Sequence, residues 1–175
     1  IFSIHQMIQK NCFDGKKVFI HCFTDGRDTA PDSAKMFLDQ INQECKRKGI
    51  GRIATLIGRY YAMDRNNKWD RIQKAYDLLT KSVGQVFKDP IEALNFWYQK
   101  GITDEFMEPC VILGDDGQPV SVKANDALFF FNYRADRAIQ ITKAFVQPDF
   151  KEFERTHVPN LYYIGMTQYD RTITE

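Results

Sequence analysis

Short apolar runs alternate along the chain with longer segments in which apolar residues recur every three or four positions. The short runs favour β-strands and cover residues 18–23, 53–57, 127–131 and 161–166. The longer segments favour amphipathic helices and cover residues 1–11, the stretch from Pro31 to Gly49, 69–79, 91–100 and 135–145. Strands and helices therefore follow one another, which is the pattern of α/β proteins.

Two further runs, 110–113 and 119–122, predict a β-hairpin because the turn-forming sequence GDDGQ separates them. The run 127–131 is continuously apolar, which is typical of a central strand covered on both faces. Together the elements predict a three-layer α/β sandwich, with a mostly parallel sheet flanked by helices and a small antiparallel hairpin addition. The 175 residues are enough for one domain with its own core.

Arginine follows three of the apolar runs, next to carboxylate or glycine. The segments are TDGRD, RYYAMDR and YRADR. If the three runs are strands of one sheet, their arginines gather along one edge, where open α/β sheets bind ligands. These arginines are Arg27, Arg59, Arg65, Arg134 and Arg137. Because a guanidinium is a planar fork of donors that stays charged, the cluster suits the carboxylate and phosphate oxygens of a small anion.

Arg134 and Arg137 are three residues apart at the start of a predicted helix, so they share one face of it. Free backbone N–H groups and the positive end of the helix dipole lie at the same point. Together these features predict an anion site. The alternative is that both arginines pair with Asp136 or with other surface carboxylates at a solvated helix start.

The TDGRDT segment combines a glycine turn with Arg27 and two carboxylates. Gly26 allows the backbone to approach a ligand closely, and Asp25 and Asp28 supply acceptors. Asp28 is a candidate for orienting or deprotonating a substrate hydroxyl. The alternative is ordinary turn chemistry, since Asp-Gly is common in turns.

Composition narrows the class of partner. Lys and Arg number 24 against 23 Asp and Glu, for a formal charge of +1, which argues against a nucleic-acid surface. A nucleic-acid binder that stacks bases on Tyr60, Tyr61 and Trp69 is the weaker alternative. The four cysteines are widely spaced, as expected of reduced thiols in a cytoplasmic protein. No apolar stretch is long enough to cross a bilayer, so no membrane partner is expected.

Four segments carry a resemblance to a known family. HCFTDGRDTAP, GRYYAMDRNNKWDR, FFFNYRADRAIQIT and YDRTITE, in this order and at these intervals, closely resemble the cofactor-independent (2,3-bisphosphoglycerate-independent) phosphoglycerate mutases. The likeness covers essentially the whole chain. It implies two α/β domains: one is similar to alkaline phosphatase and holds two divalent metal ions, Mn²⁺ or similar, and a transiently phosphorylated serine, and the other, the phosphotransferase domain, binds the substrate.

The resemblance implies that residues 1–175 are the phosphotransferase domain, truncated at both ends, of a cytoplasmic, monomeric glycolytic isomerase. The positions that match the family's substrate contacts are Arg27, Asp28, Arg59, Arg65, Arg134 and Arg137. A further histidine is expected before Ile1 and a lysine after Glu175, so the chain alone is expected to lack catalytic residues, metal ligands and activity. The expected substrates are 3-phosphoglycerate and 2-phosphoglycerate. The alternative is a non-catalytic anion-binding or regulatory module with the same arginine edge.

Overall fold

The computed structural model describes residues 6, 10 and 14–173. The helix predicted over 1–11 lies almost entirely outside the described residues, and so do His5 and Cys12. None of the helices in the described part combines the length and the apolar character that crossing a bilayer requires.

The main sheet has four strands in the order β1-β2-β4-β3. They are β1 (Phe19–Thr24), β2 (Arg52–Gly58), β3 (Gln85–Phe87) and β4 (Cys110–Ile112). The pairs β1/β2 and β3/β4 are parallel, and β4 is antiparallel to β2. The strands predicted at 18–23 and 53–57 are confirmed to within a residue, whereas β3 was not predicted. Its three residues are too few to show a pattern.

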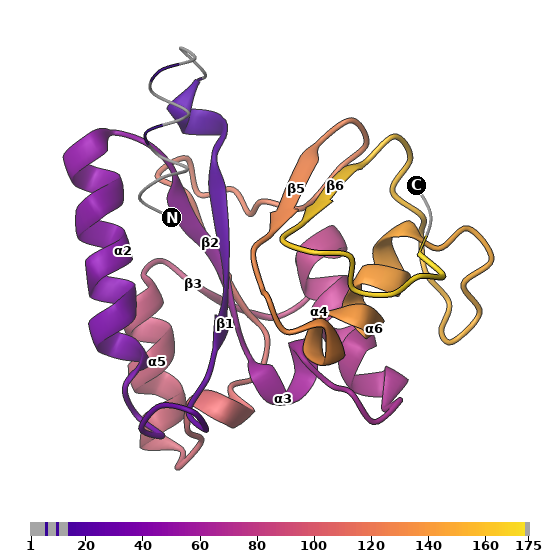
Figure 1. The fold of residues 1–175 in the computed structure, drawn as a ribbon. Coiled ribbons are helices and arrows are strands. Elements are labelled where there is room, and N and C mark those ends of the chain that lie inside the picture. The colour runs from indigo at the N-terminus through magenta and orange to yellow at the C-terminus, as the bar shows by residue number, and fades with distance from the viewer. Residues whose placement is uncertain (1–5, 7–9, 11–13, 174–175) are drawn as a thin grey trace.

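Helices cover both faces of this sheet (Figure 1). On one side lie α2 (Ala34–Lys48) and α5 (Pro90–Gln99), which contact each other and β2. On the other side lie α3 (Arg59–Ala62), α4 (Trp69–Lys81) and α6 (Ala135–Val146), and two short 3-10 turns complete the set, η1 (Gly15–Lys17) and η2 (Asp104–Phe106). The predicted α/β class, with a mostly parallel sheet between helical layers, is confirmed.

Each face of the sheet has its own hydrophobic core, because successive strand residues point to opposite sides. Leu56 of β2 belongs to the core beneath α2 and α5, together with Leu38 and Leu94. The next residue, Ile57, belongs to the core beneath α4 and α6, together with Tyr76. Strand β2 is therefore buried on both faces and serves as the rigid centre of the domain.

The predicted hairpin over 110–113 and 119–122 is wrong. The turn itself forms, with the Gly114 N–H donating to the Gln118 carbonyl across 3.0 Å, but no strand follows it. The chain instead returns to α4, where the Val122 N–H donates to the carbonyl of Leu79 across 2.8 Å. Val122 is buried in the α4 core, so burial rather than strand pairing fixes this segment. The antiparallel pairing of the main sheet comes from β4 against β2.

The prediction of a central strand at 127–131 is also wrong. Strand β5 (Ala127–Phe130) pairs in parallel with β6 (Tyr162–Gly165) in a separate two-stranded sheet. One face of it packs on the α6 core through Phe130, whereas Phe129 is 39% exposed and Phe131 49% exposed. In the part of the chain that the structure describes, this apolar run therefore packs against a core on one of its two faces. The two sheets still touch, since the rings of Phe23 and Phe130 lie 5.8 Å apart.

Candidate functional site

Arg59 is the best anchored of the predicted site residues. It follows β2 directly as the first residue of α3 and is only 4% exposed. Its Nη1 donates to a carboxylate oxygen of Asp25 and, across 2.7 Å, to Oδ2 of Asp28. Both carboxylates lie in the loop after β1. The pairing therefore joins the ends of two neighbouring parallel strands.

Arg65 and Arg134 share a second carboxylate, that of Asp136 in the first turn of α6. Nη1 of Arg65 lies 2.7 Å from Asp136 Oδ2, and Nη2 of Arg134 lies 3.1 Å from the same oxygen. Nη1 of Arg134 also lies 3.8 Å from Oδ2 of Asp28. Asp28 and Asp136 thus link Arg59 and Arg65, which follow β2, with Arg134, which follows β5, into one network. The network forms although β5 belongs to a different sheet from β1 and β2.

Arg137 lies beside this network and pairs differently. Its Nη1 donates to the backbone carbonyl of Met63 across 2.9 Å, which ties α6 to the segment between α3 and Arg65. Burial lowers the pKa of Arg137, and the nearby charges of Arg65, Arg59 and Arg134 lower it further. The hydrogen bond to Met63 brings Arg137 to the segment that carries Arg65.

Arg27 lies at the margin of the group. It is exposed, and its Nη1 is 3.5 Å from Oε1 of Glu105. Its charge still contributes to lowering the pKa of Asp28. We call Arg27, Arg59, Arg65, Arg134 and Arg137 the arginine cluster. Ion pairs bring Arg59, Arg65 and Arg134 together, although not along one edge of a single sheet as predicted. Contact with a substrate stays a prediction.

The two shared carboxylates are both held in the ionised form. The hydrogen bond from Arg59, followed by its charge, lowers the pKa of Asp28. The hydrogen bonds from Arg134 and then Arg65 lower the pKa of Asp136 to about 2. A carboxylate whose pKa is lowered is a poor general base near neutral pH, so Asp28 is better suited to orienting a hydroxyl than to deprotonating it.

The alternative predicted for the start of α6 is correct in one part. Arg134 does pair with Asp136, through Nε and Nη2, whereas Arg137 turns to a backbone carbonyl. Arg134 is the N-cap residue, and its side chain makes no cap hydrogen bond. The guanidinium is therefore directed to the network and not to the backbone of its own helix.

The sequence analysis did not identify two buried carboxylates near the cluster. Asp64, 2% exposed, accepts hydrogen bonds from the backbone N–H groups of Asn66 and Lys68 at 2.8 and 3.0 Å and so shapes the loop that carries Arg65. Asp104, 1% exposed, lies in η2, far along the chain from the loops that it touches. The signal that could have found Asp64 is its place in the RYYAMDR segment, whereas TDEF around Asp104 carries no recognisable pattern.

The site does not have the character of a metal centre. The described residues contain no group of three or more His, Cys, Asp or Glu side chains arranged to hold a metal ion. The carboxylates of the cluster are already paired with guanidinium groups, whose positive charge opposes a cation. The donor set therefore fits an anion and not a divalent metal.

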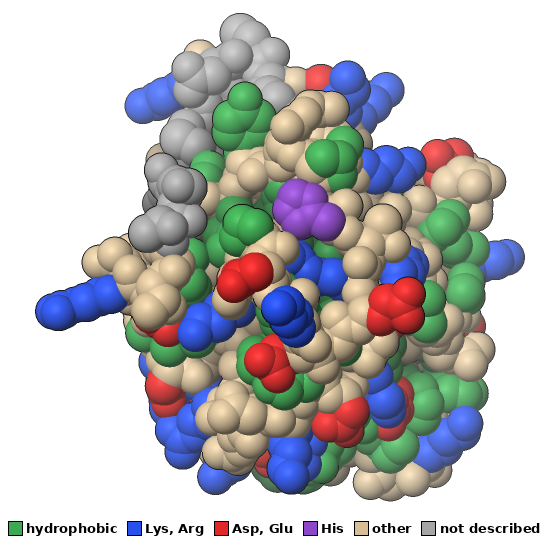
Figure 2. Space-filling view, turned by 90° about the vertical axis from the view of Figure 1, so that its right-hand side faces the viewer, with side chains coloured by type: hydrophobic (Ala, Val, Ile, Leu, Met, Phe, Trp, Pro, Cys, Tyr) green, Lys and Arg blue, Asp and Glu red, His purple; other side chains and the backbone are tan. Residues whose placement is uncertain are grey.

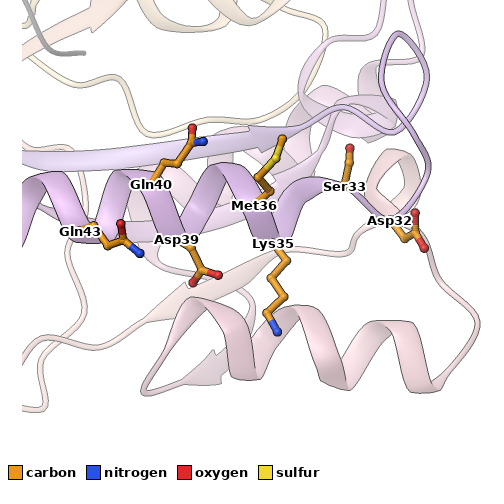
Figure 3. A pocket seen from close by; sticks show the side chains of 7 residues that line it. All are labelled: Asp32, Ser33, Lys35, Met36, Asp39, Gln40 and Gln43. Atoms are coloured by element: carbon orange, nitrogen blue, oxygen red, sulfur yellow. The ribbon is translucent and has the colours of Figure 1, made fainter.

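A shallow open pocket lies elsewhere, on the outer face of α2. Figure 3 shows that all of its side chains come from α2 and the turn before it, from Asp32 to Gln43. No arginine of the cluster lines it. On the face at the α6 side of the molecule, Figure 2 shows basic and acidic side chains interspersed over the described surface, with no continuous basic stripe of the kind that follows a nucleic-acid backbone.

These features define an α/β domain whose strand ends carry a cluster of arginines tied together by shared carboxylates. Residues 1–171 match the family described as BPG-independent PGAM N-terminus (iPGM_N). The chain therefore belongs to this family, in agreement with the resemblance seen in its motifs.

Individual relatives agree with the family match. The chain is 48% identical to a 2,3-bisphosphoglycerate-independent phosphoglycerate mutase of Moorella thermoacetica, over 90% of this chain and 31% of that protein. It is 46% identical to such a mutase from Methanosarcina barkeri, over 97% of this chain and 34% of the relative. A phosphoglycerate mutase of Leishmania mexicana, solved at low cobalt concentration, superimposes with a TM-score of 0.86 at 27% identity, over 97% of this chain and 33% of that one. The chain thus spans about a third of the relatives that it matches.

Proposed function

We propose that the chain is the phosphotransferase domain, truncated at both ends, of a BPG-independent phosphoglycerate mutase. In this proposal the arginine cluster binds 3-phosphoglycerate and 2-phosphoglycerate. The observation that carries the proposal is the convergence of arginines from the segments after β2 and β5 on Asp28 and Asp136. The family match supports the identity of the substrate.

The pairing within the cluster is compatible with binding an anion. Each guanidinium has five N–H donors, and the carboxylates occupy only some of them. Asp28 and Asp136 hold Arg59, Arg65 and Arg134 in place, so these side chains lose little further freedom when a ligand arrives. A phosphoglycerate carries a carboxylate at one end and a phosphate on its second or third carbon, and both groups match the guanidinium fork.

Holding the substrate is the larger part of what this chain contributes. Phosphoryl transfer depends mainly on positioning the reacting groups and on neutralising charge. Arg134 and Arg137 at the start of α6 would bind one end of the substrate, and Arg59 and Arg65 the other. Asp28 would orient a hydroxyl of the glycerate.

The remaining chemistry is assigned to a second domain. The family resemblance implies a serine that takes the phosphoryl group and two divalent metal ions, Mn²⁺ or similar, that would supply charge neutralisation. We place both outside residues 1–175, in the second domain that the resemblance implies. The same resemblance supports a cytoplasmic, monomeric enzyme that acts in glycolysis.

Titration calorimetry of the full-length protein with 3-phosphoglycerate, beside a coupled mutase assay, tests the proposal. We expect binding and turnover, both lost together when Arg134 is changed to Ala. Binding without turnover would support a non-catalytic anion-binding module in place of a mutase. Absence of binding would remove the proposed role of the cluster, and turnover by residues 1–175 alone would contradict the placement of the serine in a second domain.

A further inference from the structure

Asp104 forms hydrogen bonds with the residues at both ends of the loop between β1 and α2. This loop covers residues 25–33 and carries Arg27 and Asp28. Before the loop, the hydroxyl of Thr24 donates to the backbone carbonyl of Asp104 across 2.7 Å. After it, the backbone N–H of Ala34 donates to the carboxylate of Asp104 across 2.8 Å. One buried residue therefore fixes where the loop leaves the sheet and where it enters the helix.

The other polar groups of Asp104 are also engaged. Its backbone N–H donates to the carbonyl of Pro31, within the loop, across 2.9 Å. The hydroxyl of Tyr98 in α5 donates to the second carboxylate oxygen. Asp104 thus binds the loop at three points and is itself held from α5. A carboxylate with all of its polar partners inside the protein is a rigid support.

The backbone around Asp104 lies against both strand ends of the site. Gly26 adopts φ +64°, and a Cβ placed on it would lie 2.7 Å from the Cβ of Asp104. A Cβ placed on Gly58, the residue before Arg59, would lie 2.3 Å from the carbonyl oxygen of Glu105. The η2 turn therefore packs directly against the loop after β1 and against the end of β2, and only glycine fits at the two contacts.

We propose that Asp104 is a positioning residue for the arginine cluster. It does not touch the substrate. It holds the loop so that Arg27 and Asp28 face the ligand, and the carboxylate of Asp28 in turn fixes the guanidinium of Arg59. An exposed loop of this length samples many conformations unless its ends are tied, and each conformation lost on binding weakens affinity. This inference rests on the proposed function of the cluster.

The test compares Asp104→Ala with Leu79→Ala in the full-length protein. Leu79 is 3% exposed in the core beneath α4, so its truncation destabilises the domain without reaching the loop. Hydrogen exchange of the loop amides and the KM for 3-phosphoglycerate are measured for both. We expect Asp104→Ala to speed exchange over 25–33 relative to β2 and to raise KM by roughly 10–100-fold, the usual effect of losing a supporting partner. Leu79→Ala should do neither.

Two milder variants keep the test decisive should Asp104→Ala fail to fold. In Asp104→Asn the side-chain oxygen still accepts a hydrogen bond from the Ala34 N–H. The amide N–H₂ faces the Tyr98 hydroxyl, whose oxygen can accept a hydrogen bond. The KM of Asp104→Asn should therefore be closer to the wild-type value than the KM of Asp104→Ala. Tyr98→Phe removes one hydrogen bond only and should give an intermediate KM. Loop exchange and KM in Asp104→Ala no different from those in Leu79→Ala would overturn the inference. If the wild-type protein binds no 3-phosphoglycerate, the proposed function fails, and the exchange comparison still decides whether Asp104 holds the loop.

Discussion

Nη1 of Arg59 lies 2.7 Å from Oδ2 of Asp28, and this ion pair joins the end of β2 to the loop after β1. Strand register explains the meeting, because Thr24 lies opposite Gly58 in the parallel pair, so both chains leave the sheet at the same level. Arg59 is buried and its partner is largely exposed, so the pair ties a buried guanidinium to a carboxylate at the surface.

Replacing Arg59 tests the centre of the site. Arg59→Lys keeps the charge, but an ammonium is a point charge without the planar fork of donors that suits a substrate carboxylate or phosphate. We expect the loss of about 2 kcal/mol of binding free energy, roughly 30-fold in the Kd for 3-phosphoglycerate measured by calorimetry. The matched control is Arg47→Lys, since Arg47 pairs with Glu44 on the exposed side of α2. Equal affinities for the two variants would contradict the role of Arg59.

Two glycines allow the energetic cost of backbone strain to be measured separately from the cost of close packing. Gly26 and Gly49 both have φ +64°, yet a Cβ at Gly49 meets nothing within 4 Å, whereas one at Gly26 meets Asp104. Gly49→Ala should cost about 1 kcal/mol of unfolding free energy from left-handed strain alone. Gly26→Ala should cost more and should also weaken substrate binding, as measured by urea unfolding and calorimetry. If both variants lose the same stability, the loop is not packed on η2 as described.

The predictable parts of the fold are those whose signal is local. Helix α4 shows apolar residues at helical spacing and α5 has Pro90 at its first turn after the capping residue Asp89, so both were found within two residues. The separation of β5 from the main sheet could not be predicted, because an apolar run reports burial and not the strand with which it pairs. The same holds for β4, whose partners come from distant segments.

The site residues likewise divide into those that the sequence could predict and those that it could not. Arg27, Arg59 and Arg134 lie within four residues of the end of a strand, so a rule about strand ends was enough to single them out. Their grouping survives the split into two sheets because the carboxylates of Asp28 and Asp136 connect the loops. Asp104 acts from 70 residues or more along the chain, through hydrogen bonds with Ala34 and Thr24. Only the folded arrangement reveals such a partner.

Acid should weaken the Asp136 network within a defined range. The guanidinium partners lower the folded-state pKa of Asp136 to about 2, below the value near 4 of an unfolded chain. Between these values the unfolded state binds more protons, so stability rises with pH and is lost as pH falls from about 4 to about 2. Unfolding free energy measured against pH should be flatter over this range in Asp136→Asn.

Salt provides the control for that measurement. Asp136 and Arg65 are both close to half exposed, so added salt should screen their attraction and shrink the difference between wild type and Asp136→Asn. A difference that salt does not change would point to a packing effect of the substitution instead of the ion pairs. The carboxylate of Glu44, whose pKa its Arg47 hydrogen bond lowers to about 2, contributes equally to both proteins.

His21 should give a second acid transition at higher pH. Its Nδ1 lies 2.9 Å from the Thr55 hydroxyl, between β1 and β2, and burial, followed by the charge of Arg52, lowers its pKa to about 4. An unfolded histidine titrates near pH 6.5. Between about pH 6.5 and about pH 4 the unfolded chain therefore binds a proton that the folded chain does not bind. Stability should therefore fall with pH over this range, by at most about 3 kcal/mol.

Substitution separates this transition from that of Asp136. His21→Gln keeps a polar group near Thr55 but cannot titrate, so its unfolding free energy should be flat where that of the wild type declines. His157→Gln is the matched control, because His157 is exposed in the loop before β6 and should leave the decline in place. A wild-type profile that is already flat between pH 6.5 and 4 would show that His21 takes up its proton in the folded protein, which its place between the two strands opposes.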